Sequence, residues 1–296
     1  MKKCIFYTGI ALLFATSCNK EIDNQVINNE SLVPVTVHVT GFSVSQEDFP
    51  TTRAAESVAS YANVNAITLA FYNDSTQVYK ATQLKTDSTT FTTFGKFNLN
   101  LPTGSYTMVA IAHTTKETSP FVLTSPTLAA YTGEHSYETF VKTQTVDITT
   151  TAASVDVTAV PERIVSQLMV KSTDEKTAGV TNVRMTFSAG SWSFNPTTGL
   201  ATSNTGCANK VGSSGAVGTQ TTSRAYLFLA SDEQTMDVTI ETLGASGNVI
   251  FSTIVHNVPF KRNRVTVLTG KLYSSVSLMG SFQIETEWLP DYNGTF

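Results

Sequence analysis

Side chains that could perform catalysis or hold a metal are few and widely spaced in this 296-residue sequence. No Gly-x-Ser-x-Gly elbow presents a serine nucleophile, and Cys207 lacks the local pattern of a cysteine nucleophile. The glycine-rich stretch 206–223 lacks the Lys-Ser or Lys-Thr of a phosphate-binding loop. No His-x-His pair or His-Glu-x-x-His helix occurs among the four histidines, which are His38, His113, His135 and His256. We therefore predict a non-enzymatic protein with no catalytic residues, no metal site and no cofactor.

The chemistry that the sequence does predict is lipidation of Cys18. Two lysines precede an apolar run, Ile5 to Ala15, which is too short to span a bilayer and fits the hydrophobic region of a secretory signal peptide. The run leads into Ala-Thr-Ser-Cys, which resembles a bacterial lipobox in which Ala15 replaces the usual leucine. In such signals residues 1–17 are removed and the thiol is acylated, and each buried CH2 contributes about 0.8 kcal/mol to anchoring. The alternative is a soluble secreted protein in which Cys18 is incidental.

Removing the signal also changes the charge and the thiol content of the chain. Lys2, Lys3 and Cys4 leave with it, so the formal net charge changes from -4 to -6, and Cys207 has no thiol partner for an intramolecular disulfide. Residues 18–33 are polar and are interpreted as a flexible tether. Because Lys and Arg are scattered through an acidic chain, we expect no DNA or RNA partner.

The elements that must position any site are predicted to be strands. Threonine contributes 48 of 296 residues and aromatic residues 10%, and both suit a pleated sheet. Runs that are apolar on both faces, 106–112, 225–230 and 249–255, predict central strands. Gly41 predicts a bulge, 206–223 a mobile surface loop, and 57–63 at most a short helix. The predicted fold class is therefore all-β. Runs with strand-like alternation are Val35-Val37-Val39, Ile67-Leu69-Phe71, Phe97-Leu99-Leu101, Val155-Val157-Ala159, Val183-Met185-Phe187, Met236-Val238-Ile240 and Phe282-Ile284.

A division into two domains is predicted at Val160-Pro161. This dipeptide separates two strand-rich stretches, each close to the common size of a domain. We therefore expect an N-terminal β-sandwich domain over residues 34–160 and a C-terminal β-sandwich domain over residues 161–296.

The stretch from Val258 to Leu272 resembles the Arg-Asn, Thr, Gly, Leu pattern of the fimbrillin family, whose members are subunits of Bacteroidetes type V pili. A Thr-Thr-Arg-Ala run at 51–54, a Pro-Glu-Arg run at 161–163 and the lipobox accompany it. The resemblance implies two tandem transthyretin-like β-sandwich domains, export to the cell outer membrane and structural or adhesive work in a fimbrium. The structural alternative is that Arg262 and Asn263 only turn the chain into a strand.

Three functional hypotheses follow. The first is a polymerising or tip subunit, matured by a trypsin-like cut after Arg53, whose polar surroundings lack strand alternation. The second is an uncleaved, lipid-anchored base subunit. The third, outside the family, is a surface glycan-binding lipoprotein, in which Trp192 and Trp288 could line a sugar site, although single aromatics in strand patterns are more often core residues.

Assembly by donor-strand exchange is what the resemblance implies for the first hypothesis. In the family, the cut removes the first strand of the N-terminal domain, which here carries Val35, Val37 and Val39, and a segment of a neighbouring subunit replaces it. Phe282, Ile284 and Trp288 lie on the alternating face of a candidate donor strand near the C-terminus. The alternative is that this segment is the ordinary last strand. The expected partners are other fimbrial subunits, the outer membrane through the lipid on Cys18, and an unknown receptor.

Overall fold

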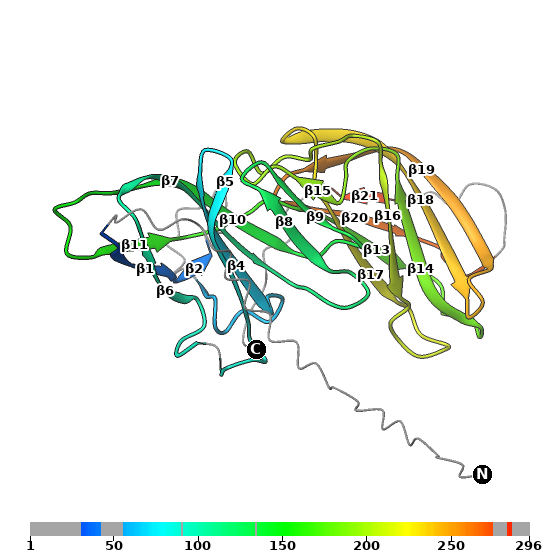
Figure 1. The fold of residues 1–296 in the computed structure, drawn as a ribbon. Helices are drawn as coiled ribbons and strands as arrows, with labels where there is room; N and C mark the ends of the chain where they lie inside the picture. Colours follow the sequence, from blue (N-terminus) through cyan, green and yellow to red (C-terminus); the bar gives the residue numbers. More distant parts are fainter. Residues whose placement is uncertain (1–30, 43–55, 90, 134, 275–282, 286–296) are drawn as a thin grey trace, which may run out of the picture. The chain divides into compact units, whose positions relative to one another are not determined.

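The computed structural model describes residues 31–42, 56–89, 91–133, 135–274 and 283–285 (Figure 1). All regular elements in these ranges are β-strands, which confirms the all-β fold class. No helix within the described ranges is long and apolar enough to cross a membrane. Cys18, Arg53, Phe282 and Trp288 lie outside the described residues, so what is predicted for them stays a prediction.

A five-stranded antiparallel sheet has the order β12-β10-β7-β4-β5. Its central strand β7 contains the run 106–112, so that prediction is confirmed. Met108 and Ala110 pack into one hydrophobic core, whereas Val109 and Ile111 pack into another, which explains why the run has no polar face. The strands are β4 (Ala66–Asn73), β5 (Thr76–Leu84), β7 (Gly104–His113), β10 (Thr139–Ile148) and β12 (Glu162–Arg163).

A three-stranded sheet, β11-β1-β6, shares the first of these cores with the five-stranded sheet. Its middle strand β1 runs antiparallel to β6 and parallel to β11. The strands are β1 (Val33–Val39), β6 (Lys96–Leu101) and β11 (Val155–Ala159). The odd-numbered residues of β1 face the core, as the alternation predicts.

Two four-stranded sheets, β17-β13-β20-β21 and β16-β14-β18-β19, share a further core. β13 and β20 pair in parallel, and the other neighbours in these sheets pair antiparallel. The first sheet contains β13 (Ser166–Ser172), β17 (Thr222–Leu227), β20 (Val265–Gly270) and β21 (Gln283–Glu285). The second contains β14 (Val180–Phe187), β16 (Cys207–Gly212), β18 (Glu233–Gly244) and β19 (Val249–Lys261).

Two small sheets complete the described fold. The sheet β15-β9-β8 joins residues from both sides of Pro161, and the remaining core contains side chains from both sides as well. The division at Pro161 stays a prediction. The strands are β8 (Phe121–Ser125), β9 (Leu128–Tyr131) and β15 (Ser193–Phe194), with β2 (Gly41–Phe42) and β3 (Glu56–Ser57) in a two-stranded ladder.

Two of the three predicted central strands lie at the ends of their sheets. The run 225–230 is buried, but most of it belongs to β17, the last strand in its sheet. The run 249–255 belongs to β19, which is an edge strand with exposed aliphatic side chains. Both predictions of a central position are wrong, because apolar side chains on two faces do not determine whether the backbone has two neighbours.

Two of three local predictions differ from the structure. The stretch 206–223 is a loop only after Gly212, and the buried Lys176 ammonium holds that loop through the carbonyls of Ser213 and Gly215, at 2.9 and 3.2 Å. Residues 57–63 contain no helix, which agrees with the expectation of at most a short one: Ser57 ends β3, and turns lie at 58–60 and 62–63. Gly41 does not form a bulge; instead the chain leaves the β1 ladder at Thr40 and pairs with β3.

Candidate functional site

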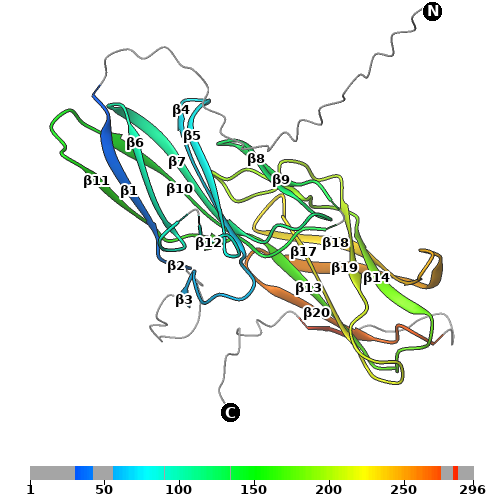
Figure 2. The same cartoon turned by 60° about the horizontal axis from the view of Figure 1, so that its bottom comes forward.

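The strand β1 occupies a slot between β6 and β11 (Figure 2). Val37 lies opposite Phe97 of β6 and Val157 of β11. Val35, Val37 and Val39 are at most 2% exposed, and they pack into the core shared with the five-stranded sheet. The strand predicted to be displaced is therefore paired on both sides and buried on its apolar face.

Loss of β1 would uncover the inner edges of both neighbours. Five residue pairs join it to β11 and six join it to β6, so both ladders would lose their hydrogen-bonding partners. Full burial of a valine side chain contributes about 1.5–3 kcal/mol, which would also be lost at each position. A chain without β1 therefore needs an extended replacement with the same alternation.

The connection that carries Arg53 joins two neighbouring strands. Gly41 pairs with Ser57 and Phe42 pairs with Glu56, so residues 43–55 link the ends of the β2–β3 ladder. A cut after Arg53 would divide the chain between these two strands. It would separate β1 and β2 from the rest of the chain without interrupting another described strand.

Phe42 of β2 adds an aromatic anchor to this N-terminal segment. Its side chain is 1% exposed, and its ring centroid lies 4.1 Å from that of Phe140 and 5.0 Å from that of Tyr61. Such pairs contribute about 0.5–1.5 kcal/mol beyond the area they bury. The segment before Arg53 is thus held by ring packing as well as by the β1 ladders.

A buried ion pair lies beside these rings. The Arg163 Nε atom is 2.6 Å from Glu138 Oε1, and the two side chains are 8% and 6% exposed. Tyr61 Oη donates to the same carboxylate oxygen at 2.6 Å, and Asn63 Nδ2 donates to the other at 3.0 Å. The guanidinium carbon lies 5.2 Å from the centre of the Phe140 ring. Arg163 of the Pro-Glu-Arg run therefore ties the chain after Pro161 to residues of the first half.

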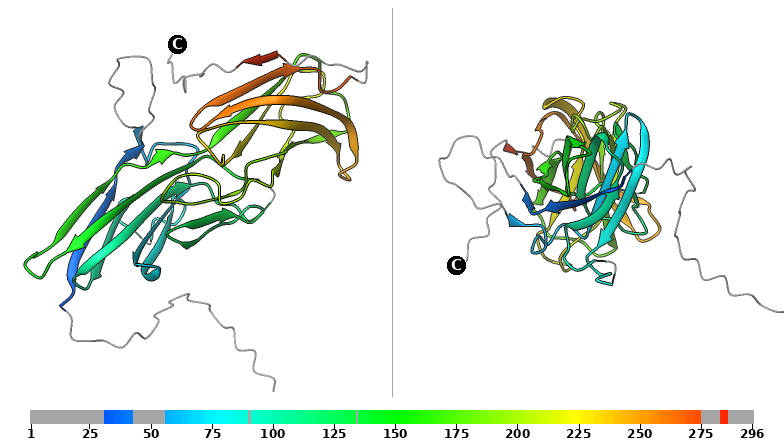
Figure 3. Two further views of the ribbon diagram at one scale, coloured as in Figure 1. Left: turned by 90° about the horizontal axis from the view of Figure 1, so that it is seen from above. Right: turned by 60° about the vertical axis from the view of Figure 1, so that its left-hand side comes forward.

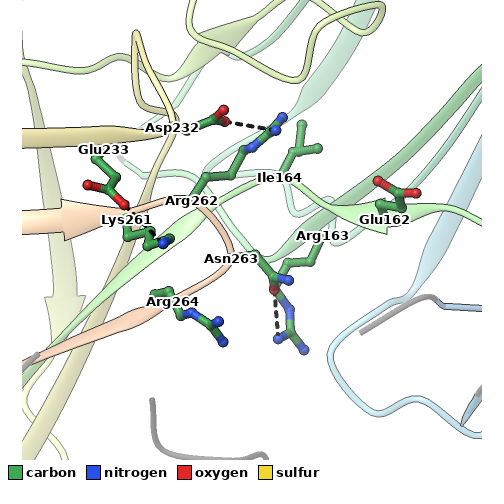
Figure 4. Close-up of a pocket in the computed structure, with 9 residues that line it drawn as sticks. All are labelled: Glu162, Arg163, Ile164, Asp232, Glu233, Lys261, Arg262, Asn263 and Arg264. Carbon is green, nitrogen blue, oxygen red and sulfur yellow. Dashed lines mark hydrogen bonds and ion pairs between the residues drawn. The ribbon is translucent and has the colours of Figure 1, made fainter. Parts of the chain in front are cut away.

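The Arg-Asn element forms the turn between β19 and β20, as its structural interpretation predicts. Asn263 adopts a left-handed conformation with φ of 58°, and its N–H donates to the Val165 carbonyl at 2.9 Å. Arg262 Nη2 pairs with Asp232 Oδ1 at 2.8 Å, and its Nη1 donates to the Thr198 carbonyl at 3.0 Å. The turn borders a polar cavity of about 390 Å³ (Figure 4). The lining residues are Glu162, Arg163, Ile164, Asp232, Glu233, Lys261, Arg262, Asn263 and Arg264.

Asp174 clamps the chain just after β20. Its carboxylate accepts hydrogen bonds from the N–H groups of Leu272, Tyr273 and Ser274 at 2.8 to 2.9 Å, and from Ser274 Oγ at 2.9 Å. Burial by itself raises the pKa of Asp174, but these four donors outweigh it, and the pKa lies below the usual value. The clamp fixes the point from which the C-terminal segment departs.

Of the candidate donor residues, Ile284 lies in the described part of the chain. It belongs to β21, the short red strand of Figure 3. There it lies opposite Leu268 of β20. β21 has three residues and ends its sheet, so β20 is its only neighbour among the described strands.

His113, Cys207 and Trp192, whose side chains could in principle react or bind, are packed into the fold. His113 is 1% exposed, its Nε2 lies 3.0 Å from Thr68 Oγ1, and burial lowers its pKa to about 3. Burial raises the pKa of the Cys207 thiol to about 12, which makes it a poor nucleophile. Trp192 packs against a hydrophobic core, in line with its core interpretation. In the described ranges no group of His, Cys, Asp or Glu side chains could hold a metal ion.

Sequence reasoning missed the cluster around Phe42 and Glu138. Its contacts span up to about one hundred positions, as between Tyr61 and Arg163, and the pattern near Glu138 contains nothing that predicts a buried charge. Arg163 was the single available signal, because it belongs to the Pro-Glu-Arg run.

Comparisons with solved structures find folds similar to that of this chain in proteins from Bacteroides and Porphyromonas. A candidate adhesin from Bacteroides ovatus is 8% identical with a TM-score of 0.50, and the match covers 88% of this chain and 97% of that chain. A candidate adhesin from Bacteroides thetaiotaomicron is 11% identical with a TM-score of 0.50, over 88% and 98% of the two chains. The fimbrial anchor protein Mfa2 from Porphyromonas gingivalis is 10% identical with a TM-score of 0.49, over 87% and 99%. No curated protein matches the sequence.

At these identities the likeness concerns the fold alone, and it confirms the fimbrillin-like resemblance at that level. The layout as two transthyretin-like domains stays a prediction. The profile of one sequence family matches residues 30–294, which is nearly the whole chain beyond the predicted tether. The chain therefore belongs to the family of unknown function DUF6562.

Proposed function

We propose that this protein is a non-enzymatic subunit of a fimbria, exported as a lipoprotein and assembled by donor-strand exchange after a cut near Arg53. The observation that carries the proposal is the position of β1, which lies between two strands that come later in the chain. The cut would release β1 while its two neighbours remain. An extended segment of another subunit could then pair with both inner edges and place alternate side chains in the core.

The C-terminal segment is the proposed donor. Phe282, Ile284 and Trp288 share the alternation that the valine face of β1 shows. Three residue pairs attach β21 to β20, far fewer than the eleven that hold β1. β21 therefore loses fewer backbone pairs on release than β1 does.

Limited cleavage of the purified full chain with a trypsin-like protease tests this mechanism. We expect a cut after Arg53 followed by polymers that dissociate in sodium dodecyl sulfate. Deleting residues 280–296 should abolish the polymers while the fold is retained, as measured by circular dichroism. Arg53→Ala is the matched control. This variant should not be cut at residue 53, and its oligomeric state should not change on protease treatment.

Two results would contradict the mechanism. If the Arg53→Ala chain polymerised as well as the protease-treated wild type, the cut after Arg53 would not be required for assembly. Polymers formed by the cleaved, truncated chain would show that another segment fills the slot.

A second candidate, the anchor subunit, is supported by the completeness of the uncut fold. All β1 valines are buried with the strand in place, so the chain needs no donor before cleavage. N-terminal sequencing of the protein recovered from assembled fimbriae distinguishes the two candidates. A terminus at Ala54 supports the polymerising subunit, and an acylated Cys18 supports the anchor.

Lipidation is tested separately with Cys18→Ala. The variant should leave the membrane fraction and lose incorporation of labelled palmitate, since acyl chains supply the anchoring free energy. A wild type that carries no acyl label and a variant that stays in the membrane would together contradict this part of the proposal, including its outer-membrane location.

A further inference from the structure

The outer edge of β19 is an unusual surface on this molecule. Among the described strands only β18 pairs with β19, which therefore ends its sheet (Figure 1). The side chains of Val249, Ile250 and Ile254 are 46%, 45% and 55% exposed. Within the described part of the chain, this edge thus presents backbone groups that no other strand pairs with, together with exposed aliphatic side chains.

Three of the other edge strands carry a charge, a protection that soluble proteins commonly use. A charged residue interrupts β5 at Lys80, β11 at Asp156 and β16 at Lys210. Residues 249–255 of β19 contain no charge, no proline and no glycine. Such an edge favours pairing with another strand.

The sequence of this edge is nearly the same in both directions. Around Ser252 it reads Val-Ile-Phe-Ser-Thr-Ile-Val, so that its outer two positions on each side are identical. In an antiparallel pair of identical strands centred on Ser252, Ile250 lies opposite Ile254 of the second copy and Val249 opposite Val255. A two-fold interface requires this kind of self-complementary pattern.

We propose that the protein forms a two-fold homodimer in which β19 of one copy pairs antiparallel with β19 of a second copy, centred on Ser252. The two four-stranded sheets then become one continuous sheet. Four isoleucines line one face of the junction, and cross-strand pairs of β-branched residues stabilise antiparallel ladders. The interface does not involve β1, and therefore the proposal is independent of cleavage and donor-strand exchange.

The charges next to the junction allow this pairing. Glu241 lies opposite Ser252 in the β18–β19 ladder, and Arg184 Nε lies 2.6 Å from its Oε2. Three strand spacings of about 4.8 Å would separate Glu241 from its copy, a distance beyond the screening length of about 8 Å at physiological salt. Like charges therefore do not oppose the contact.

Irregularities limit the length of the paired edge. Register shifts occur at Ile250 and at His256–Asn257, and Asn257 has a positive φ of 55°. Because bulges bend a strand, the regular ladder is short, and the buried area belongs to the small interface class. We expect a dissociation constant in the micromolar range.

Sedimentation equilibrium of the full chain at about 1–200 µM tests the proposal. To keep the chain water-soluble and limit its thiols, Cys4 and Cys18 are replaced by Ser. The apparent mass of this Cys4→Ser, Cys18→Ser parent chain, the wild type for the comparisons below, should rise from about 32 to about 64 kDa over this concentration range. Ile254→Lys should raise the dissociation constant at least about tenfold, because both copies lose the contact. Val78→Lys, at a similarly exposed aliphatic residue of edge strand β5, is the matched control and should leave it unchanged.

Cross-linking measures the register directly. Ser252→Cys in the same background should form a disulfide-linked dimer under mild oxidation, because residues on the two-fold axis have Cα atoms about 4.5–5.5 Å apart. Ser246→Cys, in the exposed turn before β19, should not. A monomeric wild type at 200 µM, a dimer lost in Val78→Lys but not in Ile254→Lys, or open-ended assemblies in place of dimers would each overturn the proposal.

Discussion

The strands β1 and β19 have similar compositions and opposite surroundings. Residues 33–39 of β1 and 249–255 of β19 are both rich in β-branched apolar side chains and carry no acidic residue. β1 pairs on both sides and buries its valines, whereas β19 pairs with one described strand and exposes three aliphatic side chains. The strand with a half-polar pattern is the central one.

This difference shows that side-chain pattern and backbone pairing are separate properties. The alternation of apolar and polar side chains in β1 indicates that one face of the strand is buried, and in the structure the five-stranded sheet covers that face. It contains no information on how many strands flank the backbone, which depends on β6 and β11 from distant parts of the chain. The apolar run in β19 likewise reports two apolar faces, of which only one is covered.

An acidic substitution is expected to give the largest difference in stability between variants of β1 and variants of β19. Val37→Asp places an unpaired carboxylate in a fully buried position, and we expect it to reduce the free energy of unfolding by about 4 kcal/mol or more. Ile254→Asp, in β19, should change it by less than about 0.5 kcal/mol. Urea denaturation at a protein concentration below that of dimer formation measures both, and similar losses would contradict the comparison.

The next effect concerns the buried ion pair beside the β1 segment. Arg163→Met leaves the Glu138 carboxylate without its cation, and we expect a loss of about 3–5 kcal/mol in the free energy of unfolding. Adding Glu138→Gln should restore part of it, because the remaining partners Tyr61 and Asn63 can bond a neutral amide. A double variant as unstable as the single variant would show that the ring packing of Arg163, not its charge, dominates.

Acid should destabilise the protein through His113 of β7. Burial lowers the folded-state pKa to about 3, below the ordinary value of 6.5, so the unfolded chain binds the proton first. Stability is therefore complete above pH 6.5 and falls as the pH decreases toward 3, by about 2–3 kcal/mol at pH 4.5. In His113→Gln this part of the pH dependence should disappear, while His256→Gln on the exposed face of β19 should retain it. Equal acid profiles for wild type and His113→Gln would contradict the assignment.

The smallest effect is expected beside β19. Arg184 and Glu241 form an ion pair with side chains 38% and 15% exposed, and Arg184→Ala should reduce the free energy of unfolding by only about 0.5 kcal/mol. Thermal or urea unfolding measures this loss. A loss as large as that of Arg163→Met would mean that the sheet containing β19 depends on its surface charges as strongly as the β1 region depends on Arg163.

Much of the fold follows from local patterns. The alternation of Phe97, Leu99 and Leu101 predicts β6, and the run 106–112 predicts a central strand because both of its faces are covered. β16 escaped prediction because Asn209, buried in the structure, is polar and is satisfied by contacts with Ser136 and Tyr226 that lie far away in sequence. Position within a sheet depends on such distant partners.

The candidate site was predicted less completely. The valine face of β1 was visible in the sequence, and its two flanking strands were predicted as strands without their pairing. The sequence predicted a bulge at Gly41 and no contact for the next residue, Phe42, which packs on Phe140 nearly one hundred residues later. Ring packing and buried ion pairs join residues by tertiary proximity, which a single sequence does not encode locally.

The parallel pairing of β13 with β20 has a mechanical consequence. The chain enters β13 from its N-terminal end and leaves β20 at its C-terminal end, where Asp174 binds the backbone of residues 272–274. A pull along the strands on residues 163 and 274 in opposite directions would load the six paired positions in shear, so their hydrogen bonds would have to yield together. An antiparallel hairpin pulled from its two ends would instead unzip one rung at a time. The β13–β20 ladder should therefore resist tension applied between residues 163 and 274 more strongly than a hairpin of the same length.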